Sequence, residues 1–366
     1  MANETERRKI DHIRICLEKN VEAKNLTSGF ENVFFVHRAV PRVDYESIDL
    51  SVDFLGHKFS APIIVEALTG GAEKATEINR VIALAVEELG LGMGVGSQRA
   101  AIEDESLEYT FKVVRENAPN AFIIANLGYS QIASEYSIKE VKRAVEMIEA
   151  NAIAIHLNTL QEVIQTEGKP GGKSLCDKII DIADAIDVPL IIKETGCGIA
   201  AEEAELLESL GVDCIDVAGA GGTSWAAVEY YRALEAGDET KKHLGEAFWD
   251  WGIPTAVSIV EVSQTTKLKV IASGGIRSGL HIAKSIALGA DMTGIALPIL
   301  KAAVLGLEEV KRKLKTFMEC LKTCMFLVGV SKIEELKNTP VILTGLVAEW
   351  LKARGFNIEE YARRAP

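Results

Sequence analysis

The sequence has no uninterrupted apolar segment of the roughly 20 residues that a helix needs to cross a bilayer. Its charged N-terminal segment, residues 1–11, lacks the apolar stretch of a secretory signal peptide. Positive charge is also in short supply, since 40 Lys and Arg residues stand against 53 Asp and Glu residues, for a net charge of −13. These absences predict a cytoplasmic protein that binds neither membranes nor nucleic acid, although a few local cations would suffice to hold one anionic substrate.

Cysteine is sparse and scattered. Of the six cysteines, only Cys320 and Cys324 are near neighbours. Their spacing places both thiols on one face of a helix, and no histidine or second cysteine pair lies close by in the sequence. Structural zinc sites need more ligands, in closer groups. We therefore expect core thiols at these two positions and no zinc site.

What the sequence does contain is a regular alternation of short apolar β-type segments and amphipathic helical segments. The apolar segments recur roughly every 25 to 35 residues. They are almost continuously apolar, as expected for parallel strands that are buried on both faces. The predicted strands are residues 62–65, 91–95, 122–125, 152–157, 190–192, 214–217, 269–272 and 292–297.

The segments between these strands have helical periodicity. In the segment 77–89, for example, Ile78, Val81 and Ile82 fall on one face. Eight strands that alternate with helices predict an α/β fold of the closed (β/α)8 type, the TIM barrel. An open doubly wound sheet would usually carry a glycine-rich turn after its first strand, whereas here glycines follow many strands. The other predicted helices are 138–150, 176–186, 201–210 and 278–288.

The alternation covers residues 61–302, so we predict a single barrel domain. An N-terminal helical and hairpin extension occupies residues 1–60, and a helical tail occupies residues 303–366, with a helix at 305–327. The segment 221–253, rich in charge and tryptophan, is predicted to be a long loop. Two interpretations of this loop are equally consistent with its sequence: a lid over a binding site, and a contact between subunits.

The N-terminal extension contains two predicted elements. A helix is expected at residues 5–17, because apolar and charged residues alternate there with helical spacing. A β-hairpin is expected from residues 50–54 and 58–59, with its turn across Gly56-His57. A hairpin at this position, directly before the first barrel strand, would plug the bottom of the barrel.

Polar residues and glycines gather at the carboxyl ends of the predicted strands. In α/β barrels this end carries the active site. The opposite ends of the strands are not built in this way, so the concentration predicts an enzyme. The strand ends are Thr69-Gly70-Gly71, Gly96-Ser97-Gln98-Arg99, Asn126-Leu127-Gly128, His156 with Asn158, Gln161 and Glu162, Lys193-Glu194-Thr195-Gly196, Gly219 to Ser224, Ser273 to Arg277, and Ala296-Leu297.

The segment 273–277, Ser-Gly-Gly-Ile-Arg, predicts a phosphate site at the seventh strand. Glycines let the backbone approach a phosphate closely, and the N–H groups at the start of the following helix point at it. A single glycine pair would serve a tight turn equally well. The second glycine-rich segment, 219–223, adds neighbouring donors and favours phosphate binding.

Lys193 stands at the end of an apolar strand, where its ammonium must be partly buried. Burial of a charge is costly unless an anion compensates it. A reduced flavin is such an anion, with negative charge at N1 and O2, and the alternative is a structural ion pair with an acid. Glu194 is not the expected partner, because adjacent residues on a strand point to opposite faces.

The fourth strand ends in a polar cluster. His156 and Asn158 share a face by the two-residue period of a strand. A lone histidine is usually a core residue, but these neighbours favour a function. Glu162 is a candidate ligand for Mg²⁺, which prefers one or two carboxylates with phosphate oxygens and water. Gln161 is a candidate for a hydrogen bond to substrate.

Arg8, Lys9 and His12 lie on the predicted first helix, with Arg8 and His12 on one face. Taken alone, this pattern indicates a solvated charged face. Together with the strand ends, however, it resembles the type 2 isopentenyl diphosphate isomerases, which are FMN-dependent enzymes. The resemblance runs over essentially the whole chain, and the combination of motifs is specific, although single motifs occur in other FMN barrels. The motifs are Arg8-Lys9-x-x-His12, Thr69-Gly70-Gly71, Gly96 to Arg99, Asn126 to Gly128, His156-x-Asn158-x-x-Gln161-Glu162, Lys193-Glu194-x-Gly196, Ala220 to Trp225, and Ser273 to Arg277.

The resemblance implies an enzyme that converts isopentenyl diphosphate to dimethylallyl diphosphate in isoprenoid biosynthesis. Reduced FMN would act as its acid and base. Mg²⁺ would bind Glu162, and NADPH would reduce the flavin. The implied catalytic residues are Gln161, Lys193, His156 and Glu229. The implied substrate-binding residues are Arg8, Lys9, Ser97, Gln98, Arg99, Asn158, Gln161 and Trp225. The implied FMN-binding residues are Leu68, where methionine is common in the family, Thr69, Gly70, Ser97, Asn126, Lys193, Thr223, Gly275, Ile276, Arg277, Ala296 and Leu297.

The resemblance also implies a homo-oligomer, a tetramer or an octamer, in which the N-terminal arm with Arg8 and Lys9 reaches a neighbouring subunit. Two other functions stay open. A 2-hydroxy-acid oxidase would carry a catalytic histidine where this chain has Ala220, so that activity is not expected. A non-catalytic barrel would be colourless and would bind no FMN.

Overall fold

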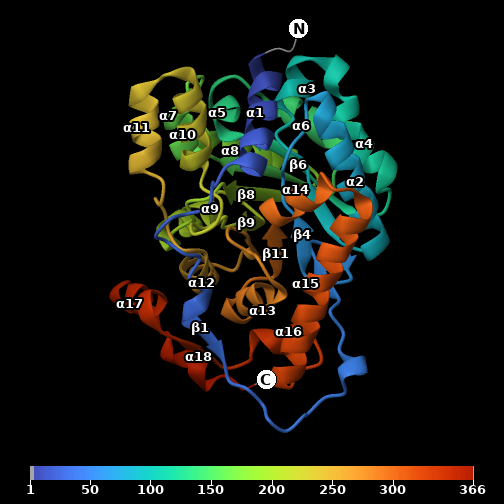
Figure 1. Ribbon diagram of the computed structural model, residues 1–366, viewed down its shortest axis with the longest axis vertical. Coiled ribbons are helices and arrows are strands. Elements are labelled where there is room, and N and C mark those ends of the chain that lie inside the picture. Colours follow the sequence, from blue (N-terminus) through green and yellow to red (C-terminus); the bar gives the residue numbers. More distant parts are fainter. Residues whose placement is uncertain (1–3, 366) are drawn as a thin grey trace.

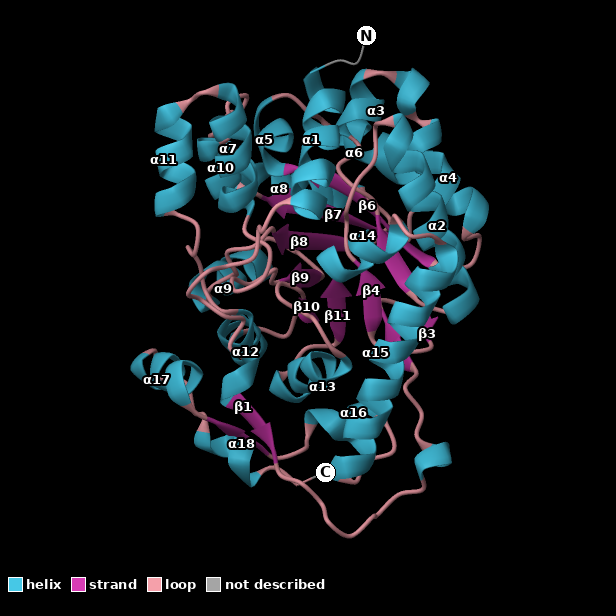
Figure 2. Cartoon of the chain, viewed as in Figure 1, coloured by secondary structure: helices cyan, strands magenta, loops and turns pink. Residues whose placement is uncertain are grey.

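A computed structural model describes residues 4–365 of the chain. Its centre is a closed barrel of parallel strands in the order β10-β11-β4-β5-β6-β7-β8-β9, surrounded by helices (Figures 1 and 2). The predicted (β/α)8 fold is confirmed, and each barrel strand overlaps a predicted one. The strands are β4 Ile63–Val65, β5 Gly92–Gly94, β6 Phe122–Gly128, β7 Ala152–Leu157, β8 Leu190–Glu194, β9 Cys214–Asp216, β10 Lys269–Ala272 and β11 Met292–Ile295.

The hairpin of the N-terminal extension is also confirmed, as β2 Val52–Phe54 and β3 His57–Phe59. Its buried Phe54 and Phe59 pack with the inward-facing side chains of the barrel strands, so the hairpin closes the bottom of the barrel. The turn lies one residue earlier than predicted. Phe54 pairs with His57, and Leu55-Gly56 form a two-residue turn with φ of 46° and 78°, as tight hairpins of this twist require.

The helices that were predicted between strands are present, and the structure adds several. The longer helices of the barrel layer are α2 Glu73–Leu89, α4 Tyr109–Asn117, α6 Ile138–Met147, α8 Leu175–Ala185, α9 Ala201–Ser209, α12 Thr255–Thr265 and α13 Gly279–Leu288. Shorter helices at the strand ends are α3 Arg99–Glu103, α5 Tyr129–Ser134, α7 Thr159–Ile164 and α14 Leu297–Ala303.

The prediction of a long loop at 221–253 was wrong, because most of this segment forms two helices, α10 Trp225–Ala236 and α11 Glu239–Ala247. Ser224 caps α10 by accepting a hydrogen bond from the N–H of Ala227, at 3.2 Å. Asp238 caps α11 in the same way, and Gly237 separates the two with a φ of 73°. The two helices lie side by side near α1 (Figure 1).

The tail is mostly helical, as predicted, with α15 Leu307–Val328, α16 Ile333–Lys337, α17 Gly345–Ala353 and α18 Glu359–Arg363. The exception is β12 Val341–Leu343, which pairs antiparallel with β1 Val33–Phe35. Cys320 and Cys324 share helix α15 as free thiols. Across residues 4–365, no group of three His, Cys, Asp or Glu side chains could hold a metal ion, and no helix is long and apolar enough to cross a membrane.

Candidate active site

One cavity, with about 240 Å³ of space, opens at the carboxyl ends of the barrel strands and is bordered by helix α1 Glu4–Glu18. Polar residues from distant parts of the sequence meet there, as the strand-end pattern predicted. Of the predicted site residues, the structure brings together Arg8, Lys9, Leu68, Thr69, Ser97, Arg99, Asn126, His156, Asn158, Gln161, Glu162, Lys193, Thr223, Trp225, Gly275, Ile276, Arg277, Ala296 and Leu297.

The glycine segment after β10 forms one wall of the cavity. Gly275 has a φ of 70°, and a Cβ atom there would lie 2.8 Å from the Cβ of Ser28. Within the described part of the chain, the N–H groups of Gly275, Ile276 and Arg277 donate no hydrogen bond to a protein acceptor. Unpaired N–H groups of this kind, directly before a helix, fit an anion such as a phosphate.

Arg277 contributes to this wall through its backbone. Its guanidinium group donates hydrogen bonds to both carboxylate oxygens of Glu22, with the shorter distance at 2.8 Å. The side chain therefore already has an anionic partner, and the positive charge at this end of the cavity is partly neutralised.

Lys193 rises from β8 at the floor of the cavity. Its Nζ lies 3.0 Å from Glu66 Oε2 and 3.0 Å from Asp216 Oδ2. The ammonium therefore has two carboxylates of the protein as partners. Its burial does not by itself require the negative charge of a flavin, and the alternative of a structural ion pair is present. Glu194 is not a partner, as predicted, because its carboxylate accepts hydrogen bonds from the N–H groups that follow it in the chain.

Helix α1 is not a solvated charged face, and that prediction was wrong. Lys9 is enclosed, and its Nζ donates a hydrogen bond to the carbonyl of Ser97 at 2.6 Å. Burial, and then the neighbouring charge of Arg8, lowers the pKa of Lys9 to about 7. Arg8 and Arg99 line the same part of the cavity. A bound anion would stabilise the charged form of Lys9 and relieve the repulsion among these cations.

The same helix is the N-terminal arm that was expected to reach a neighbouring subunit. Here it lies across its own barrel, so Arg8 and Lys9 line the cavity of their own chain. The site has this cation pair without a second subunit.

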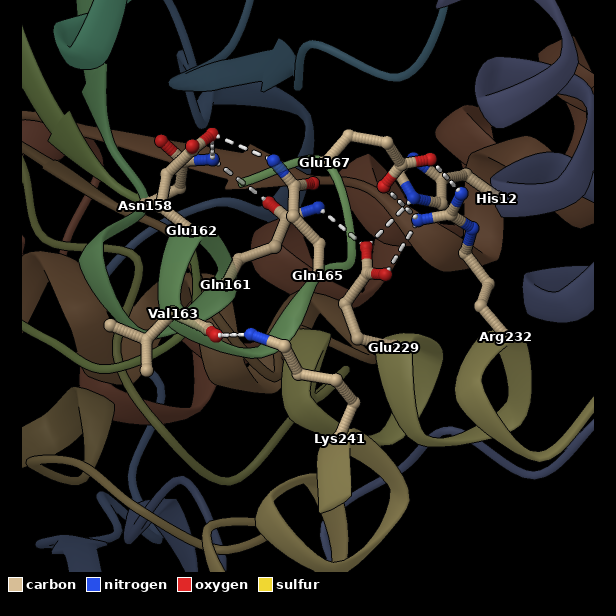
Figure 3. Close-up of polar contacts among 10 residues, drawn as sticks. All are labelled: His12, Asn158, Gln161, Glu162, Val163, Gln165, Glu167, Glu229, Arg232 and Lys241. Atoms are coloured by element: carbon tan, nitrogen blue, oxygen red, sulfur yellow. Dashed lines mark hydrogen bonds and ion pairs between the residues drawn. The ribbon is translucent and has the colours of Figure 1, made fainter. Parts of the chain in front are cut away.

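Glu229 is the centre of a buried network that joins α1, α7 and α10 (Figure 3). One carboxylate oxygen accepts hydrogen bonds from His12 Nε2 at 2.9 Å and from Gln161 Nε2 at 3.0 Å. The other accepts from Arg232 Nη1 at 2.8 Å. Burial by itself would raise the pKa of Glu229, but His12, Arg232 and Gln161 together hold it at about 2. The carboxylate is therefore a fixed negative charge behind the cavity wall.

His12 and Arg232 were not predicted to have a role in the site, and neither was Glu167. Arg232 links Glu229 to Glu167, which accepts a hydrogen bond from Arg232 Nη1 at 3.2 Å. His12 and Glu167 lie 217 and 65 positions from their partners in the sequence, so the only local signal of the network is the three-residue spacing of Glu229 and Arg232 on one helix. His12 also packs edge-on against the ring of Trp225, with 5.0 Å between ring centroids.

The polar end of β7 faces the cavity as predicted. His156 Nδ1 lies 2.9 Å from Asn126 Oδ1, and burial, followed by the charge of Lys193, lowers the pKa of His156 to about 3. The Asn126 amide nitrogen donates to the carbonyl of Val95 at 3.1 Å, so its oxygen faces His156. A neutral imidazole that carries its proton on Nδ1 satisfies this pair.

Two buried oxygen atoms in the cavity wall, Thr69 Oγ1 and Asn158 Oδ1, have no hydrogen-bond partner among the described residues. Buried polar atoms normally have one. The Asn158 amide nitrogen, by contrast, donates to Gln161 Oε1 at 3.1 Å and to Glu162 Oε1 at 3.2 Å. The two unpaired oxygens are suited to hydrogen bonds with bound molecules.

Three predicted site residues do not line the cavity: Glu229, which lies behind its wall, Gln98 and Gly70. Gln98 is fully buried, and its side chain joins the carbonyl of Ala144 to the N–H of Asn126, at 2.8 and 3.0 Å. Its expected contact with the diphosphate is therefore corrected to a structural role. Gly70 lies against the ring of Phe111, where any side chain would overlap it.

The fold and the cavity define an α/β-barrel enzyme whose cavity, at the carboxyl ends of the strands, is lined by cations and by unpaired backbone N–H groups. Residues 162–343 match the family of FMN-dependent dehydrogenases. Among solved structures, a putative lactate oxidase of Pediococcus acidilactici has a TM-score of 0.66 at 16% identity, covering 92% of this chain and 90% of that one. A mandelate oxidase variant has a TM-score of 0.62 at 18% identity, covering 93% and 98%. At this identity the likeness concerns the fold alone.

The chain belongs to the isopentenyl-diphosphate delta-isomerase family and is an isomerase. It is 49% identical to the isopentenyl-diphosphate delta-isomerase of Methanosarcina barkeri over 99% of this chain and 98% of that protein. The enzyme of the same name from Methanothermobacter thermautotrophicus is 51% identical over 98% and 99%. That from Pyrococcus furiosus is 48% identical over 98% and 91%.

Proposed function

We propose that the protein converts isopentenyl diphosphate to dimethylallyl diphosphate with FMN and Mg²⁺ bound in the cavity. One observation carries the proposal: the same cavity is lined by two different sets of groups that are suited to anions. The unpaired N–H groups at 275–277 suit the phosphate of FMN, and Arg8, Lys9 and Arg99 suit a diphosphate. NADPH as the reductant, a tetrameric or octameric assembly and a cytoplasmic location are part of the same proposal and rest on the sequence.

The reaction adds a proton at C4 of the substrate and removes one from C2, with no net change in oxidation state. When bound in its reduced form, FMN would supply the acid and the base for these two proton transfers. The residues that fit FMN are the Gly275 cradle, the unpaired hydroxyl of Thr69, Asn126 and Lys193. Arg277 would take part through its backbone N–H.

The chain itself would bind and orient the substrate. The cations on α1 and α3 would fix the diphosphate at one end of the cavity, and Trp225 would cover the hydrocarbon end and exclude water. The neutral side chains of His156, Asn158 and Gln161 lie on the wall between these ends. Glu229 would hold His12 and Gln161 in place with its fixed charge.

Glu162 fits the proposed Mg²⁺ site, because it is buried at the cavity wall and Mg²⁺ needs only one or two carboxylates when phosphate oxygens and water complete its shell. We expect Glu162→Gln to lower activity by about 100-fold or more and to remove its dependence on Mg²⁺. The measurement is isomerisation against Mg²⁺ concentration. Glu135→Gln is the control, since this exposed carboxylate pairs with Lys169, close to Glu162. An unchanged Mg²⁺ response in Glu162→Gln would exclude the site.

The glycine cradle makes a second prediction. Gly275→Ala should weaken FMN binding by about tenfold or more, because the new methyl group would displace Ser28 and disturb the N–H groups. Quenching of flavin fluorescence measures the affinity. The matched control is Gly237→Ala, which has nearly the same φ, 73° against 70°, but no atom within 4 Å of the added Cβ. Equal FMN affinities in the two variants would contradict a phosphate cradle at 275.

The deciding experiment is anaerobic incubation of the pure protein with FMN, NADPH, Mg²⁺ and isopentenyl diphosphate. Formation of dimethylallyl diphosphate is expected. Bound, reduced flavin without this product would refute the proposal. Lactate or glycolate with oxygen should give no peroxide, which tests the oxidase alternative, and a preparation that binds no FMN would favour the non-catalytic barrel.

A further inference from the structure

The floor of the cavity holds one more acid than the charge of Lys193 requires. Glu66 follows β4, Lys193 lies on β8 and Asp216 on β9, and the three form a cluster with the ammonium 3.0 Å from each carboxylate. All three are buried, with exposed fractions of 8%, 8% and 2%. We call them the Lys193 cluster. With every group ionised, its net charge is −1.

The two carboxylates are held differently. Asp216 accepts a hydrogen bond from Ser273 Oγ at 2.5 Å and does not line the cavity. Glu66 lines the cavity, and its only side-chain hydrogen bond within the described chain is the one from Lys193. Burial, and then the charge of Asp216, raises the pKa of Glu66 to about 7 despite Lys193. The surplus charge therefore lies on the acid that faces the cavity.

The neighbouring strands leave room for this carboxylate and add no charge to it. On β11, a Cβ atom at Gly294 would overlap the Glu66 carboxylate. On β5, Gly94 faces Ala67. The charged groups that act on Glu66 are thus Lys193 from β8 and Asp216 from β9, and Ser273, directly after β10, offers only its hydroxyl to Asp216.

A structural ion cluster is the alternative, but stability does not explain a second acid. Buried ion groups seldom stabilise a fold more than apolar residues of the same size. One carboxylate would be enough to balance one ammonium. Glu66 instead occupies the cavity surface, beside Leu68 and Thr69, where the proposed flavin would bind.

We propose that Glu66 is a proton-holding positioning residue, which takes up a proton from water when a negatively charged ring system binds against Lys193. This inference rests on the proposed FMN site. Reduction of bound FMN by two electrons, with one proton taken up by the flavin itself, would leave one negative charge, shared by N1 and O2. A second proton, taken up from water by Glu66, would cancel the surplus charge of the Lys193 cluster. Lys193 is then left with Asp216 and the flavin as its two anionic partners. No bond other than the new O–H bond forms on the protein.

The test is the pH dependence of the reduction potential of FMN bound to the full-length chain, under anaerobic conditions with electrochemical reduction. Between about pH 7 and 9, the wild type should take up one proton more per electron pair than Glu66→Gln, because glutamine imitates the protonated acid and cannot titrate. Glu194→Gln is the matched control. Burial raises the pKa of Glu194 to about 7 as well, but this acid does not line the cavity, so its replacement should leave the proton uptake unchanged.

A second measurement does not depend on any variant. The reduced-minus-oxidised infrared difference spectrum of the wild type should contain the C=O stretch of a newly protonated carboxylic acid, shifted in D₂O. Equal proton uptake in wild type and Glu66→Gln, absence of this band, or the same loss of a proton in Glu194→Gln would each overturn the inference. A chain that binds FMN and isomerises its substrate without the extra proton would refute only this inference, whereas a chain that binds no FMN would refute the proposed function as well.

Discussion

Lys193→Ala is expected to lower kcat/KM for isomerisation by about a thousandfold or more, because it removes the cation nearest to the proposed site of flavin charge. It should also destabilise the fold by about 3 kcal/mol at pH 8, since Glu66 and Asp216 are left as buried carboxylates without a cation. The loss of stability should be smaller at pH 6. Without Lys193 the pKa of Glu66 rises further, so protonation removes the repulsion at low pH, and the stability falls as pH rises through that pKa. Urea unfolding at the two pH values and a steady-state assay measure both effects.

A double variant separates the structural role of Lys193 from its functional role. Lys193→Met with Glu66→Gln removes the cation together with the surplus acid, so part of the lost stability should return while activity stays low. The recovery is partial because Asp216 keeps its hydrogen bond from Ser273 but has no cation. Restored activity in the double variant, or full turnover in Lys193→Ala, would exclude a role for this lysine in catalysis.

Glu229→Gln is expected to lower kcat by about 100-fold to 1000-fold, with a smaller change in KM. The change keeps the shape of the side chain but removes the charge that His12, Gln161 and Arg232 share. Misplaced partners would cost most in the chemical step, because the proposed diphosphate-binding cations on α1 and α3 remain. Steady-state kinetics at saturating and at limiting substrate, which give kcat and KM separately, measure the effect.

The control is Glu235→Gln, on the same helix α10. Glu235 pairs with Arg14 of α1, just as Glu229 pairs with His12 of α1, but it is exposed and makes no hydrogen bond to a residue that lines the cavity. If the two variants lose activity equally, the network merely attaches α1 to the barrel, and Glu229 has no special role in the reaction.

The barrel could be predicted from the sequence because each strand is a local pattern. Segments such as Ala152–Leu157 are apolar on both faces, and both bounds of this strand agree with the prediction. The predicted loop at 221–253 was wrong for a local reason too. The sequence contains the helix-capping residues Ser224 and Asp238, but the loop prediction was based on the charge and tryptophan content of the segment. The strands β1 and β12 lie outside the alternation of strands and helices, one in the N-terminal extension and one in the tail, and they pair across about 300 residues, so no local pattern links them.

By itself, the sequence determined the closed barrel and the set of strand ends whose residues line the cavity, since strand periodicity and position along the chain are local properties. Only the tertiary structure decided the partners of the charged groups. Glu66 and Lys193 are 127 residues apart and reach each other across the barrel, from strands on opposite sides of the closed sheet. Gln98 turned inward to bind backbone groups, and Lys9 became partly buried only because α1 folds over the cavity. Such pairings depend on how the sheet closes and on which helix covers it, and neither is encoded in the spacing of neighbouring residues.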